Sequence, residues 1–465
     1  MPAGQDEAAN IRNRRKEKDM KKLKACVLSI LLSLAAIWQA VPVMAAGNGA
    51  EEIRAMEEQI VEWKRSSEGE ESLLMGNLLD NAGEGGSDWW AFIISRMGTE
   101  DKQAAYLSRL RDAVEKIYQD MEASQKSYRL SDIHRIVLTV RACGGDPTNF
   151  GTDPEGNPID LVRDSVWNSL WGDPGNQGIN GYIWALIAAD SGSYEEPEDA
   201  EWTREKLITA ILSRQLADGG FGLILTDDAD VDLTSMALTA LAPYSGSEEA
   251  YTYESQVTGE TVTKTVAQAA EEAFACNAAL MQKDGTMITR DASTSESTSW
   301  AMMALAAWGR DPGTDEQFQV NGKTLLDGLK EFQLEDGGIR HSLDDADGMD
   351  GGNMAGYQAA YSLEAVYRLK AGQCGVFDLS DAPDVTDEEI QAAGEALPEL
   401  TEDGEAASGD GFSPVLIAGC AAGAVVLAAA VFLALVLREK KKKKTVSETK
   451  EPEKPYDDDD EDDDW

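Results

Sequence analysis

The chain reads RQLADGGF over residues 214–221 and DLTSMALTAL over residues 232–241. Before the glycine pair, apolar side chains recur at helical spacing, at Leu207, Ile208, Ile211, Leu212 and Leu216. They predict a helix over residues 203–216 with one apolar face, which Gly219 should end because glycine readily adopts the left-handed conformation. The second stretch predicts a helix that begins at Asp232 or Thr234, either of which can cap its first turn. That helix is apolar or small on nearly every side, so we expect it to be buried all round.

This hairpin of one outer and one inner helix recurs along the sequence. The turn is repeated as FQLEDGGI over residues 332–339, and LMQKDG at 280–285 precedes STSWAMMAL at 297–305. Six segments are candidates for buried inner helices, at residues 89–97, 131–143, 179–190, 232–244, 297–308 and 356–369. Stacked repeats of this kind bury a shared core. The sequence therefore predicts an all-α fold, an α6/α6 toroid of six helical hairpins. The competing layout is an open solenoid, which normally carries polar capping repeats at both ends.

The turn Gln-x-x-Asp-Gly-Gly-Phe followed by Asp-x-x-Thr-Ser-x-Ala-Leu resembles the repeat of the prenyltransferase and squalene-cyclase superfamily, which includes the cobalamin-carrier toroids. The resemblance covers about residues 51–372 and implies the α/α toroid fold. It does not imply one activity, because a single fold hosts many functions.

Terpene cyclisation is one activity that the resemblance implies. The sequence Asp-Val-Asp-Leu-Thr-Ser that begins at Asp230 is similar to the cyclase acid motif Asp-x-Asp-Asp-Thr-Ala. By this match Asp232 corresponds to the proton donor and Asp230 to the first aspartate, while Leu233 replaces the last one and breaks the motif. The simpler interpretation is that Asp232 caps a helix. Prenyl transfer would require zinc ligands, and the two histidines, His134 and His341, have no cysteine at ligand spacing.

Composition limits the partners. The net charge is −44, with 85 acidic and 41 basic residues among 465. Nucleic-acid binding depends on neutralising phosphates with basic side chains, so a nucleic-acid partner is not expected. The acidic residues predict a well-solvated surface.

Both ends of the chain carry membrane signals. Basic residues between positions 12 and 24 precede an apolar run at 25–36 and small residues at 43–45, which predicts a signal peptide over residues 1–46. An uncleaved anchor is the alternative. Near the other end, a transmembrane helix is predicted over residues 414–437, because its apolar run is long enough to cross the hydrocarbon core. Lysines follow it, so the tail at 438–465 should be cytoplasmic.

These signals predict a single-pass cell-membrane protein with an extracellular toroid at residues 47–375. Residues 376–413 are acidic and poor in large apolar side chains, so we expect a flexible stalk with a short helix at about residues 386–396. Gly419 and Gly423 form a GxxxG pattern that could pair two membrane helices. Cys143, Cys276 and Cys374 remain in the predicted toroid, enough for one disulfide.

Two acidic loops follow glycine turns at similar distances. Their carboxylates include Asp228, Asp230, Asp345 and Asp347. Clustered carboxylates outside the cell indicate calcium, but neither loop has the EF-hand order. A solvated acidic rim is the alternative interpretation, and no other cofactor is expected. Because these loops lead into inner helices, we expect them to share the rim at which a ligand enters.

Aromatic residues fall on the predicted inner helices. Those expected to face the axis and contact a ligand are Tyr182, Trp184, Trp300, Tyr357 and Tyr361. The alternative for each is a role in the core. The sequence thus favours a membrane-anchored binding module that holds a small or extended ligand in the barrel mouth. Its rivals are a structural or adhesive protein with a filled barrel and an extracellular glycan-active enzyme.

Overall fold

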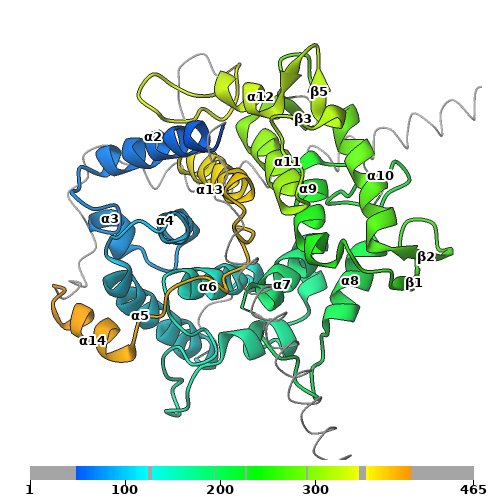
Figure 1. Ribbon diagram of the computed structural model, residues 1–465. Coiled ribbons are helices and arrows are strands. Elements are labelled where there is room, and N and C mark those ends of the chain that lie inside the picture. Colours follow the sequence, from blue (N-terminus) through cyan, green and yellow to red (C-terminus); the bar gives the residue numbers. More distant parts are fainter. Residues whose placement is uncertain are drawn as a thin grey trace, which may run out of the picture. The chain divides into compact units, whose positions relative to one another are not determined.

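The computed structural model describes residues 49–123, 128–192, 194–225, 228–289, 292–344 and 352–398. These residues are mostly helical (Figure 1). The predicted signal peptide, transmembrane helix, GxxxG pattern and cytoplasmic tail lie outside them.

Six helices match the predicted inner helices to within a few residues. They are α4 (Gly85–Arg96), α6 (Leu130–Ala142), α7 (Ile179–Ser191), α9 (Val231–Leu241), α11 (Ser295–Ala307) and α13 (Gly352–Ala371). Each contacts the next in this order, and α13 contacts α4, so the contacts form a closed cycle (Figure 1). Their sequences explain the burial, because α7, α9 and α11 are apolar or small on nearly every side.

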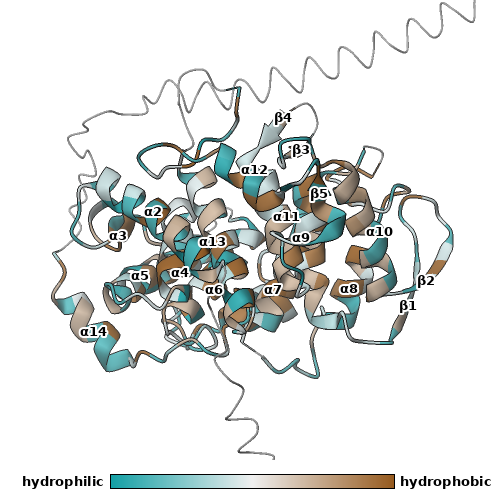
Figure 2. Ribbon diagram, turned by 45° about the horizontal axis from the view of Figure 1, so that its top comes forward, coloured by the Kyte–Doolittle hydropathy of each residue, from teal (hydrophilic) through white to brown (hydrophobic). Residues whose placement is uncertain are grey.

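A second set of helices packs outside this cycle. It comprises α2 (Ala50–Glu68), α5 (Gln103–Glu122), α8 (Arg204–Leu212), α10 (Val266–Ala279) and α12 (Leu325–Glu331). They contact α13, α4, α7, α9 and α11 respectively, and the π-helix η1 (Arg163–Trp167) packs against both α6 and α7. The outer helices are amphipathic; α5, for example, buries Tyr106, Leu110, Val114 and Ile117 at helical spacing. Figure 2 shows the apolar residues concentrated on α7, α9 and α11.

The glycine turns fix how neighbouring hairpins pack. Gly219, Gly285 and Gly337 have φ angles of 91°, 94° and 95°, which side-chain-bearing residues rarely adopt. A Cβ atom at Gly219 would lie 2.8 Å from the carbonyl oxygen of Glu272 on α10. At Gly337, in the last turn, it would lie 2.7 Å from the carbonyl oxygen of Gln59 on α2, the first outer helix. The last glycine turn therefore packs against the first outer helix, α2, and joins the last hairpin to the first.

Among the described residues, three antiparallel strand pairs interrupt the helices, a feature that the all-α prediction did not include. They are β1 (Ala250–Glu254) with β2 (Thr261–Thr265), β3 (Met287–Thr289) with β4 (Ala292–Thr294), and β5 (Gln319–Val320) with β6 (Lys323–Thr324). In the first pair, Ala250 lies opposite Thr265. The β1 sequence alternates between exposed residues and the buried Tyr251 and Tyr253, a period typical of a half-buried strand.

The predicted helix over residues 203–216 is shorter in the structure. It begins at Arg204, capped by the side chain of Thr203, and ends at Leu212. The Gln215 side chain instead donates hydrogen bonds to the carbonyl oxygens of Gly219 at 2.7 Å and Ala269 at 2.8 Å. The glutamine of the repeat therefore ties the turn to α10.

The folded body extends past residue 375, where the flexible stalk was predicted to begin, and reaches Pro398. After α13 the chain continues through residues 372–385, which we call the strap, into α14 (Asp387–Glu395). Thr386 caps α14, and α14 packs against α5 and buries Ile390. Burial of Val376, Leu379 and Ala382 explains why the strap is ordered despite its acidic composition.

Within the described ranges, no helix has both the length and the apolar character to cross a membrane. Cys143, Cys276 and Cys374 are all free thiols, so the disulfide considered for them does not form.

Candidate functional site

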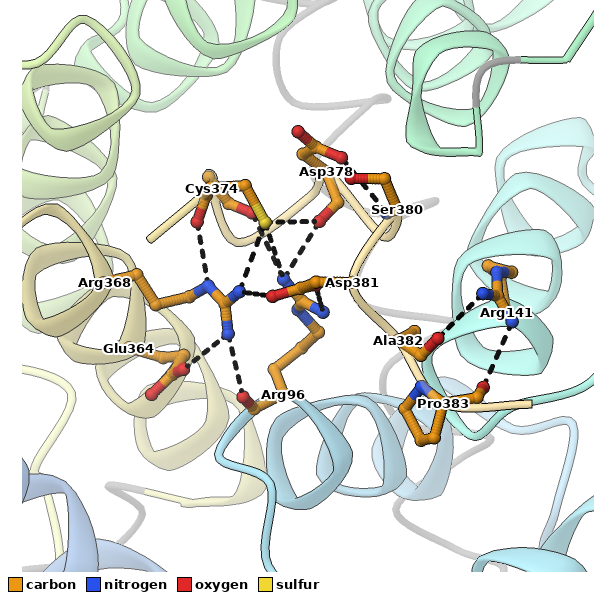
Figure 3. Close-up of polar contacts among 11 residues, drawn as sticks. Arg96, Arg141, Glu364, Arg368, Cys374, Asp378, Ser380, Asp381, Ala382 and Pro383 are labelled. Carbon is orange, nitrogen blue, oxygen red and sulfur yellow. Dashed lines mark hydrogen bonds and ion pairs between the residues drawn. The ribbon is translucent and has the colours of Figure 1, made fainter. Parts of the chain in front are cut away.

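Two buried arginines hold the strap across the C-terminal ends of α4 and α13. Arg96 donates to Asp381 Oδ1 at 2.6 Å, and Arg368 pairs with Asp381 Oδ2 (Figure 3). Arg96 also donates to the carbonyl oxygen of Asp378 at 2.9 Å, and Arg368 to that of Cys374 at 2.9 Å. Burial opposes ionisation of Asp381, but the hydrogen bond and charge of Arg96 and the charge of Arg368 lower its pKa. Asp381 is therefore a charged anchor for the strap.

Further contacts extend this attachment to α6 and α7. Arg141 donates to the carbonyl oxygens of Ala382 at 2.9 Å and Pro383 at 3.2 Å (Figure 3). The Leu379 amide donates to the carbonyl oxygen of Ser191 at 2.8 Å. The strap is thus attached to the C-terminal ends of α4, α6, α7 and α13.

Phe377 of the strap inserts its ring among aromatic side chains of the inner helices. Its ring centroid lies 5.5 Å from Phe92, 6.0 Å from Trp184 and 6.3 Å from Tyr361. Trp89 lies 5.4 Å from Trp184 and 5.5 Å from Tyr361. These are distances of packed aromatic pairs. The rings form an aromatic cluster enclosed by the inner helices.

Four of the five aromatic residues predicted to contact a ligand belong to this cluster. Trp300 is 1% exposed and lies 5.4 Å from Tyr361, which is equally buried. Tyr357 lies 6.3 Å from Tyr361, and burial raises its pKa to about 12. Trp184 lies 6.0 Å from Trp300. Their ligand-binding role stays a prediction, and the geometry observed is that of a packed core.

The fifth residue, Tyr182, lies apart from the cluster. Its ring centroid is 5.2 Å from that of Trp202, and the Arg214 guanidinium lies 5.0 Å from it. Burial, followed by the charge of Asp173, raises the pKa of its hydroxyl. The structure therefore does not bring Tyr182 together with the other four predicted residues.

A cavity of about 390 Å³ lies beside the cluster, between the strap and the C-terminal ends of four inner helices. Its helical walls are mostly apolar and come from Ile187 on α7, Ala240 on α9, Met303, Ala306 and Ala307 on α11, and Ala365 and Leu369 on α13. The strap closes the other side with Gln373, Gly375, Val376, Phe377 and Asp378. The volume falls within the range of small-molecule sites. Within the part of the chain that is described, none of the five predicted aromatic residues lines it.

Asp190 and Asp378 lie where this cavity meets a second, more open hollow of about 450 Å³ that also borders Tyr194 and Arg204. Asp190 accepts hydrogen bonds from Arg204 Nε at 2.7 Å and from the Tyr244 hydroxyl at 2.8 Å. Burial raises the pKa of Asp190, although both donors act against this. The cavity therefore has an apolar interior and carboxylates at its mouth.

Asp230, rather than Asp232, caps α9, so that part of the helix-capping prediction is wrong. Asp230 has an extended backbone, and its carboxylate accepts from the amides of Asp232 at 2.9 Å and Leu233 at 3.1 Å. The helix begins one residue earlier than predicted, which places Asp232 in the first turn. The position that the cyclase resemblance assigned to the first aspartate thus has a structural role.

The calcium candidates are only partly described. Asp228 is exposed before the Asp230 cap, whereas Asp345 and Asp347 lie outside the described residues. In the described ranges, no three His, Cys, Asp or Glu side chains are grouped to hold a metal ion. Calcium binding stays a prediction.

Sequence analysis missed the cavity residues of the strap because it assigned residues from 376 onward to a stalk. A signal was present: Val376, Phe377 and Leu379 are large apolar residues directly after an inner helix. It also placed ligand entry at the N-terminal ends of the inner helices, whereas this cavity lies at their C-terminal ends.

No family model matches this sequence, and no curated protein matches it.

Proposed function

We propose that this protein is a membrane-anchored binding module, an α/α toroid displayed outside the cell that holds a small, largely apolar molecule. The toroid is supported by the closed cycle of inner-helix contacts and by the packing of the last glycine turn against α2. The repeat that resembles the prenyltransferase and squalene-cyclase superfamily agrees with this fold. The proposed location rests on the two membrane signals in the sequence.

The observation that carries the binding function is the cavity beneath the strap. It has the volume of a small-molecule site and mainly apolar walls, with a few polar groups at one end, as such sites usually have. Its walls come from both rigid helices and the strap, so a molecule inside would contact two parts of the fold. The proposed site thus lies beside the aromatic cluster, and Phe377 belongs to both.

Filling the cavity tests this function. Ala307→Trp, on the half-buried cavity wall, should block binding of a neutral apolar probe, 1-adamantanol, to the full-length chain. Ala123→Trp, at the exposed C-terminal cap of α5, is the matched control and should leave binding unchanged. Calorimetric titration measures both. Absence of binding to the wild type, or equal binding by the two folded variants, would reject the proposed function.

A structural or adhesive surface protein is the second candidate. The aromatic cluster favours it, since Trp300 and Tyr361 are buried and their rings pack against each other as in a core. This candidate requires no ligand, so the same titration separates the two. A glycan-active enzyme has less support, because both oxygens of Asp190 already accept hydrogen bonds from the protein.

A further inference from the structure

The polar residues that line the cavity have acidic or neutral side chains. They are Asp190, Thr239, Gln373 and Asp378. No lysine, arginine or histidine stands among the described residues that line the cavity. The wall therefore offers hydrogen-bond acceptors and negative charge to a bound molecule, and no cationic partner for an anion.

Arg204 is the basic side chain at the adjoining hollow, and it already donates three hydrogen bonds within the protein. Its Nε donates to Asp190, and its Nη2 donates to the carbonyl oxygens of Ala189 at 2.7 Å and Tyr194 at 2.9 Å. It therefore neutralises Asp190 and is held by the surrounding backbone.

Asp378 has no such compensation. Its carboxylate accepts from the Ser380 amide at 3.1 Å, and within the described ranges no basic side chain forms an ion pair with it. Its backbone carbonyl, by contrast, is fixed by Arg96. The strap thus presents one exposed carboxylate at the cavity mouth that has no ion-pair partner among the described side chains, and a complementary charge would be recognised there.

We infer that the cavity selects a compact apolar molecule that carries one protonated amine. The apolar body occupies the space between α7, α9, α11 and α13, and the ammonium group lies at the mouth against Asp378, with Asp190 nearby. This inference rests on the proposed function and adds the chemical class of its ligand. Hydrogen bonds between charged partners are the stronger ones, so the amine should contribute both affinity and orientation.

Three probes that share one apolar cage test the inference by calorimetry on the full-length chain. They are 1-adamantylamine, which is protonated at neutral pH, neutral 1-adamantanol and adamantane-1-carboxylate. The amine should bind about tenfold more tightly than the alcohol, which corresponds to one charge-assisted contact. The carboxylate should bind most weakly. Added salt should reduce the preference for the amine, because the mouth is open to solvent.

Variants of the strap identify the responsible carboxylate. Asp378→Asn should abolish the preference for the amine while the alcohol binds as before, and Asp378→Lys should make the carboxylate probe the tighter ligand. Asp384→Asn is the control, since Asp384 lies on the same strap but pairs with Arg141; it should keep the preference.

The outcomes distinguish a failure of this inference from a failure of the proposed binding function. If the amine and the alcohol bind the wild type equally, or if Asp378→Asn retains the preference, the inference is wrong while the binding module stands. If 1-adamantanol does not bind the wild type, the proposed function fails, and the inference that rests on it fails with it.

Discussion

Individual residues of the repeat have structural roles. The sequence alone could not show whether these residues are structural or functional. The Thr234 hydroxyl accepts from the Phe221 amide at 2.9 Å, and Thr298 accepts from the Met287 amide at 3.0 Å in the next repeat. Each threonine thus joins a glycine turn to the inner helix that follows it. Two residues of the motif that resembles a catalytic signature, Asp230 and Thr234, are here explained by hydrogen bonds of the fold.

Asp230 provides a prediction at this scale. Asp230→Ala should lower the free energy of unfolding by about 0.5–2 kcal/mol, because two amides of α9 lose their acceptor. Asp230→Asn should remain close to the wild type, since asparagine caps equally well. Exposed Asp228, changed to Ala, serves as the control. Urea denaturation measures all three, and an equal loss in Asp228→Ala and Asp230→Ala would contradict the assignment of the cap.

The sequence predicted the cap at Asp232 or Thr234, close to its observed position at Asp230, but could not identify the right residue. Asp230, Asp232 and Thr234 all have side chains that cap helices. The choice depends on where the backbone turns from extended to helical, and this is set by packing of the preceding turn, in which the Asp230 amide donates to the Phe221 carbonyl oxygen. Helix existence follows from local pattern, whereas the exact first residue follows from tertiary contacts.

Among the elements, α2 and α13 meet through a buried charged network. Arg54 donates to Glu57 at 2.6 Å and pairs with Glu364 at 2.8 Å, and Glu364 also contacts Arg368. Burial and the neighbouring charge of Glu364 raise the pKa of Glu57 well above its ordinary 4.5. A carboxyl of this kind is held protonated more tightly in the folded state than in the unfolded state.

This network predicts a pH dependence. The stability that Glu57 contributes is fully present below pH 4.5 and is lost as pH rises through its raised pKa. Glu57→Gln cannot ionise, so its melting temperature relative to the wild type should increase between pH 4.5 and 7. Differential scanning calorimetry across this range checks it, and a constant or shrinking difference for Glu57→Gln would contradict the raised pKa.

The strap predicts a local opening. Asp381→Asn removes the charge that faces Arg96 and Arg368. Arg368 keeps Glu364, but Arg96 loses the ion-pair partner that it has among the described residues, and an unpaired buried arginine is costly, so the strap should detach more often. Chymotrypsin should then cleave faster after Phe377, whose ring is otherwise held in the aromatic cluster. Cleavage at the wild-type rate would show that the charge pair does not hold the strap.

A lower pH should act on the same contact. Because the pKa of Asp381 is lowered, the ionised anchor persists to below pH 3.8 and is lost as pH falls through the lowered value. Hydrogen exchange of the Leu379 amide, corrected for its intrinsic rate, should accelerate only in that acidic range. Acceleration already at pH 5 would contradict a lowered pKa of Asp381.

At the scale of the whole molecule, the sequence predicted the inner helices well but did not predict the strap that packs over their C-terminal ends. The six segments that include residues 232–244 and 297–308 are helical because local apolar pattern determines burial. The strap could not be predicted in the same way. Its attachment depends on Arg96, which is distant in sequence from Asp381, and on Arg368, which stands in no recognisable sequence motif. Its acidic composition indicated a solvated stalk, and the cavity it closes was missed with it.

The cavity is the central claim of this account, and methyl resonances of the full-length chain report on it directly. The methionine methyl groups are labelled with ¹³C for this measurement. Met303 lies on the cavity wall, whereas Met56 is buried on α2 and does not line the cavity. Met303→Leu assigns the first resonance. Titration with 1-adamantanol should shift the Met303 signal until it saturates and should leave the Met56 signal in place. An unmoved Met303 signal, or parallel shifts of both that never saturate, would contradict a binding site beneath the strap.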